Sequence, residues 1–257
     1  MAPIIVLIVL ALMILFFIFY KKPLKKAVLP DNFKELLLQH VPFYRRLSDE
    51  NKNRFEEKIS QFLAYVRIDG INTDVDDVDK LMVASSAVIP IFGFAAWKYY
   101  NLNNVLLYPQ TFNREEFLAS GYEKNTLGMV GNGAMQKVMI LSKPALHYGF
   151  NNDVGKENTG IHEFVHLLDK EDGDVDGLPE SLLEKKDSGT WIEMVNKNIA
   201  AILSGHSDIN LYAATNKAEF LAVASEYFFN SPGLFKENHP ELYAFMVKIF
   251  NQYPAPE

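Results

Sequence analysis

Two histidines four residues apart are the part of this sequence with the clearest chemical meaning. His162, Glu163 and His166 form the pattern His-Glu-x-x-His. On an α-helix, residues separated by four positions share one face, so the two imidazoles could hold a single divalent metal ion. The glutamate between them could take a proton from a water molecule at that metal, as in zinc hydrolases. The alternative is an ordinary helix that carries two packed or exposed histidines.

The flanking residues predict that this helix is buried along one side. A helix start signal stands upstream, where Asn158 precedes Thr159. Apolar residues then recur at spacings of three and four, which is the spacing of one helix face. They are Ile161, Phe164, Val165 and Leu168.

The composition excludes several classes of partner and site. The chain has 257 residues, 49% of them hydrophobic, enough for one large or two small domains. Its formal charge is −7, and four lysines within the first 26 residues leave −11 on the remainder. Such an acidic body argues against nucleic acid as a partner, because phosphate binding needs a basic surface. The absence of cysteine excludes disulfides and thiolate sites, and leaves histidine and carboxylates as metal ligands.

Residues 1–20 are uncharged and almost wholly apolar. Twenty helical residues span the roughly 30 Å hydrocarbon layer, so we expect one N-terminal transmembrane helix. A cleaved signal peptide is the alternative, but it would carry basic residues before the apolar run and a small-x-small cleavage site after it. Here the lysines follow, within a basic linker over residues 21–29. By the positive-inside rule, residues 30–257 then form a cytoplasmic domain at the inner membrane.

The sequence of that domain predicts an α+β fold, mainly helical with a small sheet. Residues 82–99 are apolar enough to suggest a second membrane span, but Ser85, Ser86 and Pro90 interrupt them, which favours a buried core helix. Helical spacing also runs through residues 30–66. The other predicted elements are strands at Val105–Tyr108 and Lys137–Leu141 and helices near Thr190–Leu203, Ala218–Phe229 and Glu241–Phe250.

A catalytic zinc site needs a third protein ligand and leaves one position open for water. Asp172 follows His162 by ten residues, as in metzincins, but that pattern also requires a glycine that this chain lacks. Glu219 and Glu226 lie seven residues apart on one predicted helix, so both could face the metal. Glu219 could instead close a capping box at the start of that helix. Spacing alone does not separate these two glutamates.

An acidic loop follows the histidine helix and admits a calcium interpretation. Residues 172–177 begin like an EF-hand loop, whose twelfth position must be a bidentate glutamate. Leu183 stands at that position, which argues against calcium. Asp169, seven residues after His162, is expected to orient one of the ligand imidazoles through a hydrogen bond.

Parts of the sequence resemble the Mlc titration factor A family of bacterial zinc peptidases. The resemblance extends over roughly residues 30–253 and departs from the family at Lys217 and Leu221, where proline and phenylalanine are usual. The catalytic core of that family resembles that of anthrax lethal factor, which implies a zincin-like fold of the gluzincin type. The stretches that carry the resemblance are 162–169, 176–179 and 212–229.

The resemblance also implies roles for particular residues. One zinc ion per chain would be bound by His162, His166 and Glu219. Glu163 would act as the general base, and Tyr212, seven residues before the ligand glutamate, would stabilise the oxyanion or donate a proton.

The resemblance therefore implies a zinc-dependent peptidase that acts on peptide or protein substrates, as an aminopeptidase or an endopeptidase. Glu226 and Asp169 would then support the ligand imidazoles. The alternative is a regulatory protein that sequesters a transcriptional repressor, because a member of the family binds the repressor Mlc. An intact Glu163 favours catalysis, since a docking surface has no need of it. A zinc hydrolase with another substrate class is the third interpretation.

Overall fold

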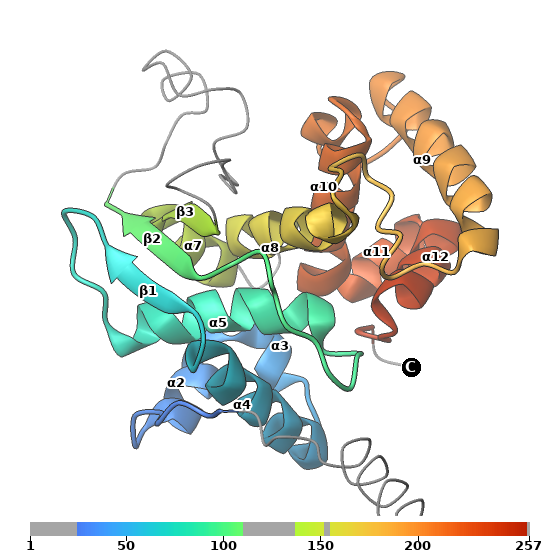
Figure 1. Ribbon diagram of the computed structural model, residues 1–257. Coiled ribbons are helices and arrows are strands. Elements are labelled where there is room, and N and C mark those ends of the chain that lie inside the picture. The colour runs from blue at the N-terminus through green and yellow to red at the C-terminus, as the bar shows by residue number, and fades with distance from the viewer. Residues whose placement is uncertain (1–24, 110–136, 152–154, 256–257) are drawn as a thin grey trace, which may run out of the picture.

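The computed structural model describes residues 25–109, 137–151 and 155–255 (Figure 1). The predicted membrane anchor and most of the basic linker lie outside these ranges. Within them, no helix is both long enough and apolar enough to cross a membrane.

A parallel sheet of three strands stands at one end of the described fold. The strands are β1 (Arg67–Gly70), β2 (Asn104–Tyr108) and β3 (Val138–Ser142), in the order β1-β2-β3. Val105 pairs with Ile68 on one side and with Met139 on the other. Strands β2 and β3 therefore match the two that the sequence predicts, whereas β1 was not predicted.

Helix α5 (Asp77–Ile91) forms the centre of the core. Asp76 caps it: its carboxylate accepts a hydrogen bond from the Asp79 backbone N–H at 2.9 Å, and the Asp79 carboxylate accepts one from Asp76 at 2.9 Å. Every residue from Leu81 to Ile91 is buried. A helix that is apolar on all sides belongs inside a protein, so the prediction of a core helix here is confirmed. It begins five residues before the predicted position and ends one residue after Pro90.

Helices surround α5 on several sides (Figure 1). Those that precede it are α2 (Phe33–His40), α3 (Pro42–Arg45) and α4 (Asp49–Leu63). Those that follow β3 are α7 (Lys143–Asn151) and α8 (Thr159–Asp169), and both pack on α5. Asp79 joins α7 to α5, since its carboxylate lies 2.7 Å from Lys143 Nζ and 2.7 Å from His147 Nε2.

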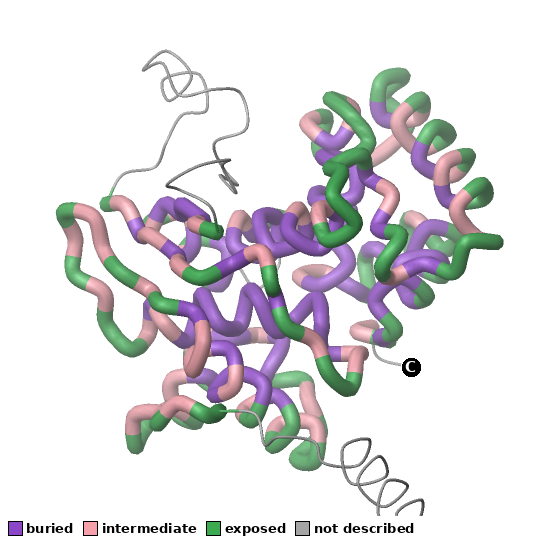
Figure 2. The backbone as a smooth tube through the Cα atoms, viewed as in Figure 1, coloured by how far each residue is buried: buried purple, intermediate pink, exposed green. Residues whose placement is uncertain are grey.

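The C-terminal part of the described fold is built mainly from four α-helices and the 3-10 turn η3, after two shorter 3-10 turns, η1 (Lys170–Asp172) and η2 (Lys185–Asp187). Helix α10 is buried throughout Ala218–Phe229, because α8 covers one side and α11 and α12 cover another (Figure 2). Rings of α10 and α12 form this second contact, with Phe228 5.9 Å and Phe229 4.9 Å from Phe250. The elements are α9 (Ser188–Leu203), the 3-10 turn η3 (Leu211–Ala214), α10 (Lys217–Asn230), α11 (Pro232–Asn238) and α12 (Pro240–Phe250).

The predicted balance of many helices and a small sheet is confirmed. The predicted helices near residues 190–203, 218–229 and 241–250 agree with α9, α10 and α12 to within two residues. Helices α7 and α11 were not predicted.

Helix α8 approaches α5 closely because a glycine lies between them. A Cβ atom at Gly160 would stand 2.1 Å from Ser86 Oγ and 2.9 Å from Ser86 Cβ. Ser86 is fully buried and its hydroxyl donates to the Met82 carbonyl at 3.0 Å, so it has no room to move away. The distance between the two helices therefore depends on the absence of a side chain at residue 160.

Gly160→Ala should lower the free energy of unfolding by about 1–3 kcal/mol, because the added methyl overpacks a filled core. Urea denaturation measures this. Gly189→Ala is the matched control: Gly189 is also the second residue of its helix, α9, and nothing lies within 4 Å of its added Cβ. The control should gain up to about 1 kcal/mol from higher helix propensity. Equal effects of the two substitutions would contradict the close approach of α8 and α5.

Candidate metal centre

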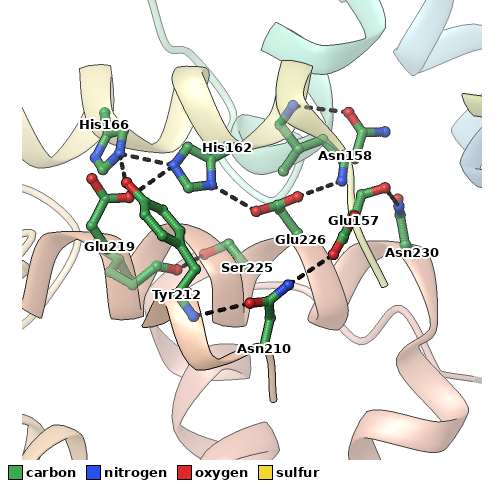
Figure 3. A network of polar contacts seen from close by, with 12 residues as sticks. Glu157, Asn158, His162, His166, Asn210, Tyr212, Glu219, Ser225, Glu226 and Asn230 are labelled. Carbon is green, nitrogen blue, oxygen red and sulfur yellow. Dashed lines mark hydrogen bonds and ion pairs between the residues drawn. The ribbon is translucent and has the colours of Figure 1, made fainter. Parts of the chain in front are cut away.

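Helix α8 brings both histidines of the pattern to one place. The Asn158 side chain begins the helix by accepting a hydrogen bond from the Ile161 backbone N–H at 3.1 Å. His162 and His166 then follow one turn apart, with their ring centroids at 4.8 Å. Both rings point away from α5 and toward α10 (Figure 3).

Helix α10 supplies the carboxylate that faces them. Asn216 caps this helix by accepting from the Glu219 backbone N–H at 2.9 Å. The Glu219 carboxylate lies toward the two imidazoles (Figure 3). Of the two glutamates that spacing could not separate, Glu219 is thus the one whose oxygen meets Nε2 atoms of both histidines.

The three donor atoms are close enough to share one ion. His162 Nε2 lies 3.1 Å from His166 Nε2 and 3.1 Å from Glu219 Oε2, and His166 Nε2 lies 3.5 Å from the same oxygen. A tetrahedral ion with ligands at about 2.0–2.2 Å separates its donor atoms by roughly 3.3–3.6 Å. These residues therefore fit a metal ion of that geometry. No second group of three such side chains gathers anywhere in the described ranges.

Glu226 contacts His162 at the ring nitrogen opposite the candidate metal position. Its Oε1 lies 2.6 Å from His162 Nδ1, the ring nitrogen that faces away from the other donors, and its Oε2 accepts from the Asn158 backbone N–H. A carboxylate on Nδ1 fixes the ring orientation and leaves the lone pair of Nε2 for a metal. Glu226 thus contacts a candidate ligand rather than the metal position itself.

Charges in this buried cluster change the protonation of its members. Burial lowers the pKa of His162, but the carboxylates of Glu226, Glu219 and Glu163 outweigh it and raise that pKa to about 10. Burial raises the pKa of Glu219, but the hydrogen bonds and charges of the two histidines hold it well below its usual range. These charges favour an ion pair between His162 and Glu219, and a metal ion held by the same atoms would displace the proton of His162.

The two residues expected to take part in chemistry also lie here. Glu163 is only 1% exposed and near enough for its charge to raise the pKa of the neighbouring His162. Tyr212 is half-buried in η3, with its ring centroid 6.2 Å from that of His162. Its side chain extends from η3 toward the three donor atoms (Figure 3).

Asp169, the last residue of α8, and Asp172 lie outside the group formed by His162, His166 and Glu219. Asp172 accepts hydrogen bonds from the backbone N–H groups of Asp174 and Glu180, so it organises its own loop. Asp169 accepts from Gly177 through Oδ2 at 2.9 Å, while its Oδ1 is buried without a hydrogen bond. Burial raises the pKa of Asp169 to about 6. No hydrogen bond joins Asp169 to a histidine among the described residues, and its predicted support of an imidazole stays a prediction.

Sequence reasoning missed several polar residues around the site. Asn158 was predicted only as a helix start, yet its backbone also holds Glu226. Glu157 and Asn210, joined to each other at 2.8 Å, had no assigned role. Asn210 stands two residues before Tyr212, a spacing that could have indicated a cap on the tyrosine turn.

Glu219→Ala should lose most of the bound metal, because it removes one of three ligands. Glu226→Ala should keep one metal ion per chain, with an affinity about 10–100-fold weaker, because only the support of His162 is lost. Elemental analysis of the purified full-length chain gives the stoichiometry, and competition with a chelator gives the affinity. If Glu226→Ala strips the metal while Glu219→Ala retains it, the assignment of the third ligand is wrong.

Known proteins resemble this chain over most of its length. The Mlc titration factor A of Pectobacterium atrosepticum is 26% identical over 231 residues, which cover 83% of this chain and 84% of the relative. That of Cronobacter sakazakii shows the same identity and the same coverage. An uncharacterized protein of Synechocystis is 28% identical over 240 residues, covering 90% of this chain and 87% of its own.

The predicted resemblance to the Mlc titration factor A family is thus confirmed. In addition, a family model described as glucose-regulated metallo-peptidase M90 matches residues 19–251. The match includes both helices that carry His162, His166 and Glu219. The chain therefore belongs to the glucose-regulated metallo-peptidase M90 family.

Proposed function

We propose that this protein is a zinc-dependent peptidase that hydrolyses peptide bonds in a peptide or protein substrate. The observation that carries the proposal is the meeting of three donor atoms from His162, His166 and Glu219 within 3.5 Å of one another. Two imidazoles and one carboxylate are a ligand set that zinc prefers in catalytic sites, where the fourth position is left for water. Membership in a metallo-peptidase family supports the same conclusion.

Zinc, when bound, supplies Lewis acidity that brings the pKa of a water molecule toward neutrality. Glu163 would act as the general base, taking a proton from the water whose oxygen adds to the peptide carbonyl carbon. Glu163 then passes the proton to the leaving amine, which restores the carboxylate. Its position beside His162 and away from bulk water suits this role.

Tyr212 would act on the oxygen of the reacting carbonyl, whereas Glu163 acts on the attacking water. The attack places negative charge on the carbonyl oxygen, and a phenol that donates a hydrogen bond to this oxygen stabilises the transition state. The tyrosine extends toward the donor atoms from η3, a different element from the two that carry the ligands (Figure 3).

The name of the relatives supports a second candidate function. A protein called Mlc titration factor A implies binding of a partner named Mlc, and the present chain could sequester a transcriptional repressor through the same fold. In that case the metal centre would stabilise a docking surface, and Glu163 would have no chemical task. The two candidates differ in what a substitution at Glu163 does.

Glu163→Gln should lower the hydrolysis rate by about 10²–10⁴-fold, because an amide cannot act as a general base. Zinc content should be unchanged, because Glu163 is not one of the three residues that meet at the metal position. Cleavage of a peptide library by the full-length chain, with and without chelator, provides the substrate and the rate. A zinc-loaded Glu163→Gln protein that cleaves as fast as the wild type would favour the binding function over the enzyme.

Tyr212→Phe should lower kcat by about 10²–10³-fold while KM stays nearly the same, because an oxyanion donor acts chiefly in the transition state. Steady-state kinetics on the peptide found above separates the two constants. Tyr253→Phe is the control, since Tyr253 is 81% exposed near the C-terminus. A rise in KM at constant kcat would instead make Tyr212 a substrate-binding residue.

A further inference from the structure

Three consecutive residues ahead of α8 each contact a different part of the C-terminal half. Lys156 Nζ lies 2.6 Å from Asp208 Oδ2 and donates to the Asp208 carbonyl at 2.9 Å. Glu157 Oε1 accepts from Asn210 Nδ2 at 2.8 Å. The Asn158 backbone N–H donates to Glu226. Residues 156–158 therefore connect the start of the metal helix to α10 and to the loop that leads into η3.

Asn210 is the last link between this segment and the tyrosine. While its Nδ2 donates to Glu157, its Oδ1 accepts from the Tyr212 backbone N–H at 2.9 Å (Figure 3). A single amide thus fixes the first turn of η3 with one end and holds the segment before α8 with the other. The Glu157 backbone carbonyl is in turn held by Asn230 Nδ2 at 2.9 Å, at the end of α10.

Tyr212 lies in a turn of only four residues, which packs against α9 and α10, and Tyr212 itself packs against the hydrophobic core. Leu211 beside it is 64% exposed, and within the turn Ala213 alone is buried. The loop before the turn is anchored at Asp208, which also accepts from Tyr227 at 2.8 Å and Asn238 at 2.8 Å. Asn210 lies between Asp208 and Tyr212, and its side chain contacts Glu157 in the segment that precedes α8.

We propose that Asn210 and Glu157 are positioning residues that set Tyr212 relative to the metal ligands. The inference rests on the proposed function of Tyr212 and adds two residues to it. Glu157 directly precedes Asn158, the cap of the helix that carries both histidines. A shift of Asn158 would therefore move the two histidines and Tyr212 together. This coupling would keep the tyrosine hydroxyl at a constant distance from the reacting carbonyl.

The geometry predicts an effect on rate with little effect on folding. Glu157 and Asn210 are both exposed, and a hydrogen bond between exposed groups contributes little to stability because water replaces it. Reaction rate is more sensitive, since a displacement of about 1 Å in a reacting group can cost about 10²-fold. A residue that only held the fold together would show the opposite pattern.

The first test compares substitutions in the zinc-loaded full-length chain. Asn210→Ala and Glu157→Ala should each lower kcat about tenfold, with KM and zinc content within about twofold of wild type. Glu157→Gln should retain the wild-type rate, because its amide oxygen can still accept from Asn210. Asn53→Ala, at an exposed asparagine of α4, is the matched control and should change nothing. Equal losses for Glu157→Gln and Glu157→Ala would overturn the role of this hydrogen bond.

The second test asks whether Asn210 acts through Tyr212. In a Tyr212→Phe background, Asn210→Ala should lower the residual kcat by less than about twofold, since there is no phenol left to misplace. If the tenfold loss persists in that background, Asn210 does not work by placing the tyrosine and the proposal fails.

A third measurement does not depend on peptidase activity. With 3-fluorotyrosine incorporated at residue 212 of the zinc-loaded chain, the fluorine NMR signal reports the surroundings of the ring. Asn210→Ala should shift or broaden this signal, and Glu157→Gln and Asn53→Ala should leave it in place. An unchanged signal in Asn210→Ala would refute the positioning role, even if the protein proves to be a repressor-binding protein. A changed signal in a protein without hydrolytic activity would support the placement and reject only the enzymatic proposal.

Discussion

The candidate metal centre depends on bringing three polar donor atoms together inside the contact between two buried helices. Helix α8 carries two of them and α10 carries the third, and α10 is buried from Ala218 to Phe229. Burying an imidazole or a carboxylate costs several kcal/mol unless its charge and hydrogen bonds are satisfied. The imidazole of His162 and the carboxylate of Glu219 satisfy one another, which is why the pKa of His162 rises to about 10 while that of Glu219 falls. The arrangement that offsets the cost of burying these groups also gives their donor atoms a spacing that fits a metal ion.

The rest of the fold fixes the two helices relative to each other. Helix α5 packs against α8 at a short distance that the absence of a side chain at Gly160 permits. Helix α12 packs against α10 through Phe250. Between them, Glu226 reaches from α10 to both the start of α8 and the back of His162. One carboxylate therefore links the helix contact to the orientation of a ligand. Rigidity of this kind matters more for a metal centre than for an ordinary core, because a ligand displaced by a fraction of an ångström binds the ion poorly.

Local signals in the sequence were sufficient to predict the helices that carry the site residues, but not how these helices pack against each other. The spacing of His162 and His166 and the cap at Asn158 depend on residues within one helix, and both were predictable. Whether Glu219 or Glu226 faces the histidines depends on how α10 rotates against α8, and helical spacing puts both on the same face. The resemblance to a family favoured Glu219, and the packing places that residue against both Nε2 atoms. Strand β1 was missed because Arg67–Gly70 has only four residues and lacks a run of apolar or β-branched side chains.

The burial of Glu163 bears on the choice between an enzyme and a docking protein. This residue is 1% exposed and adds negative charge to a cluster that already contains Glu219 and Glu226. A third carboxylate there opposes folding, because like charges in a low-dielectric interior repel one another and lose their hydration. A surface that merely docks a partner gains nothing from that cost, and an apolar or amide side chain would serve it better. In the proposed hydrolysis, by contrast, a general base would have to lie beside the metal position with little competing water, so the cost of burying Glu163 there favours hydrolysis over docking.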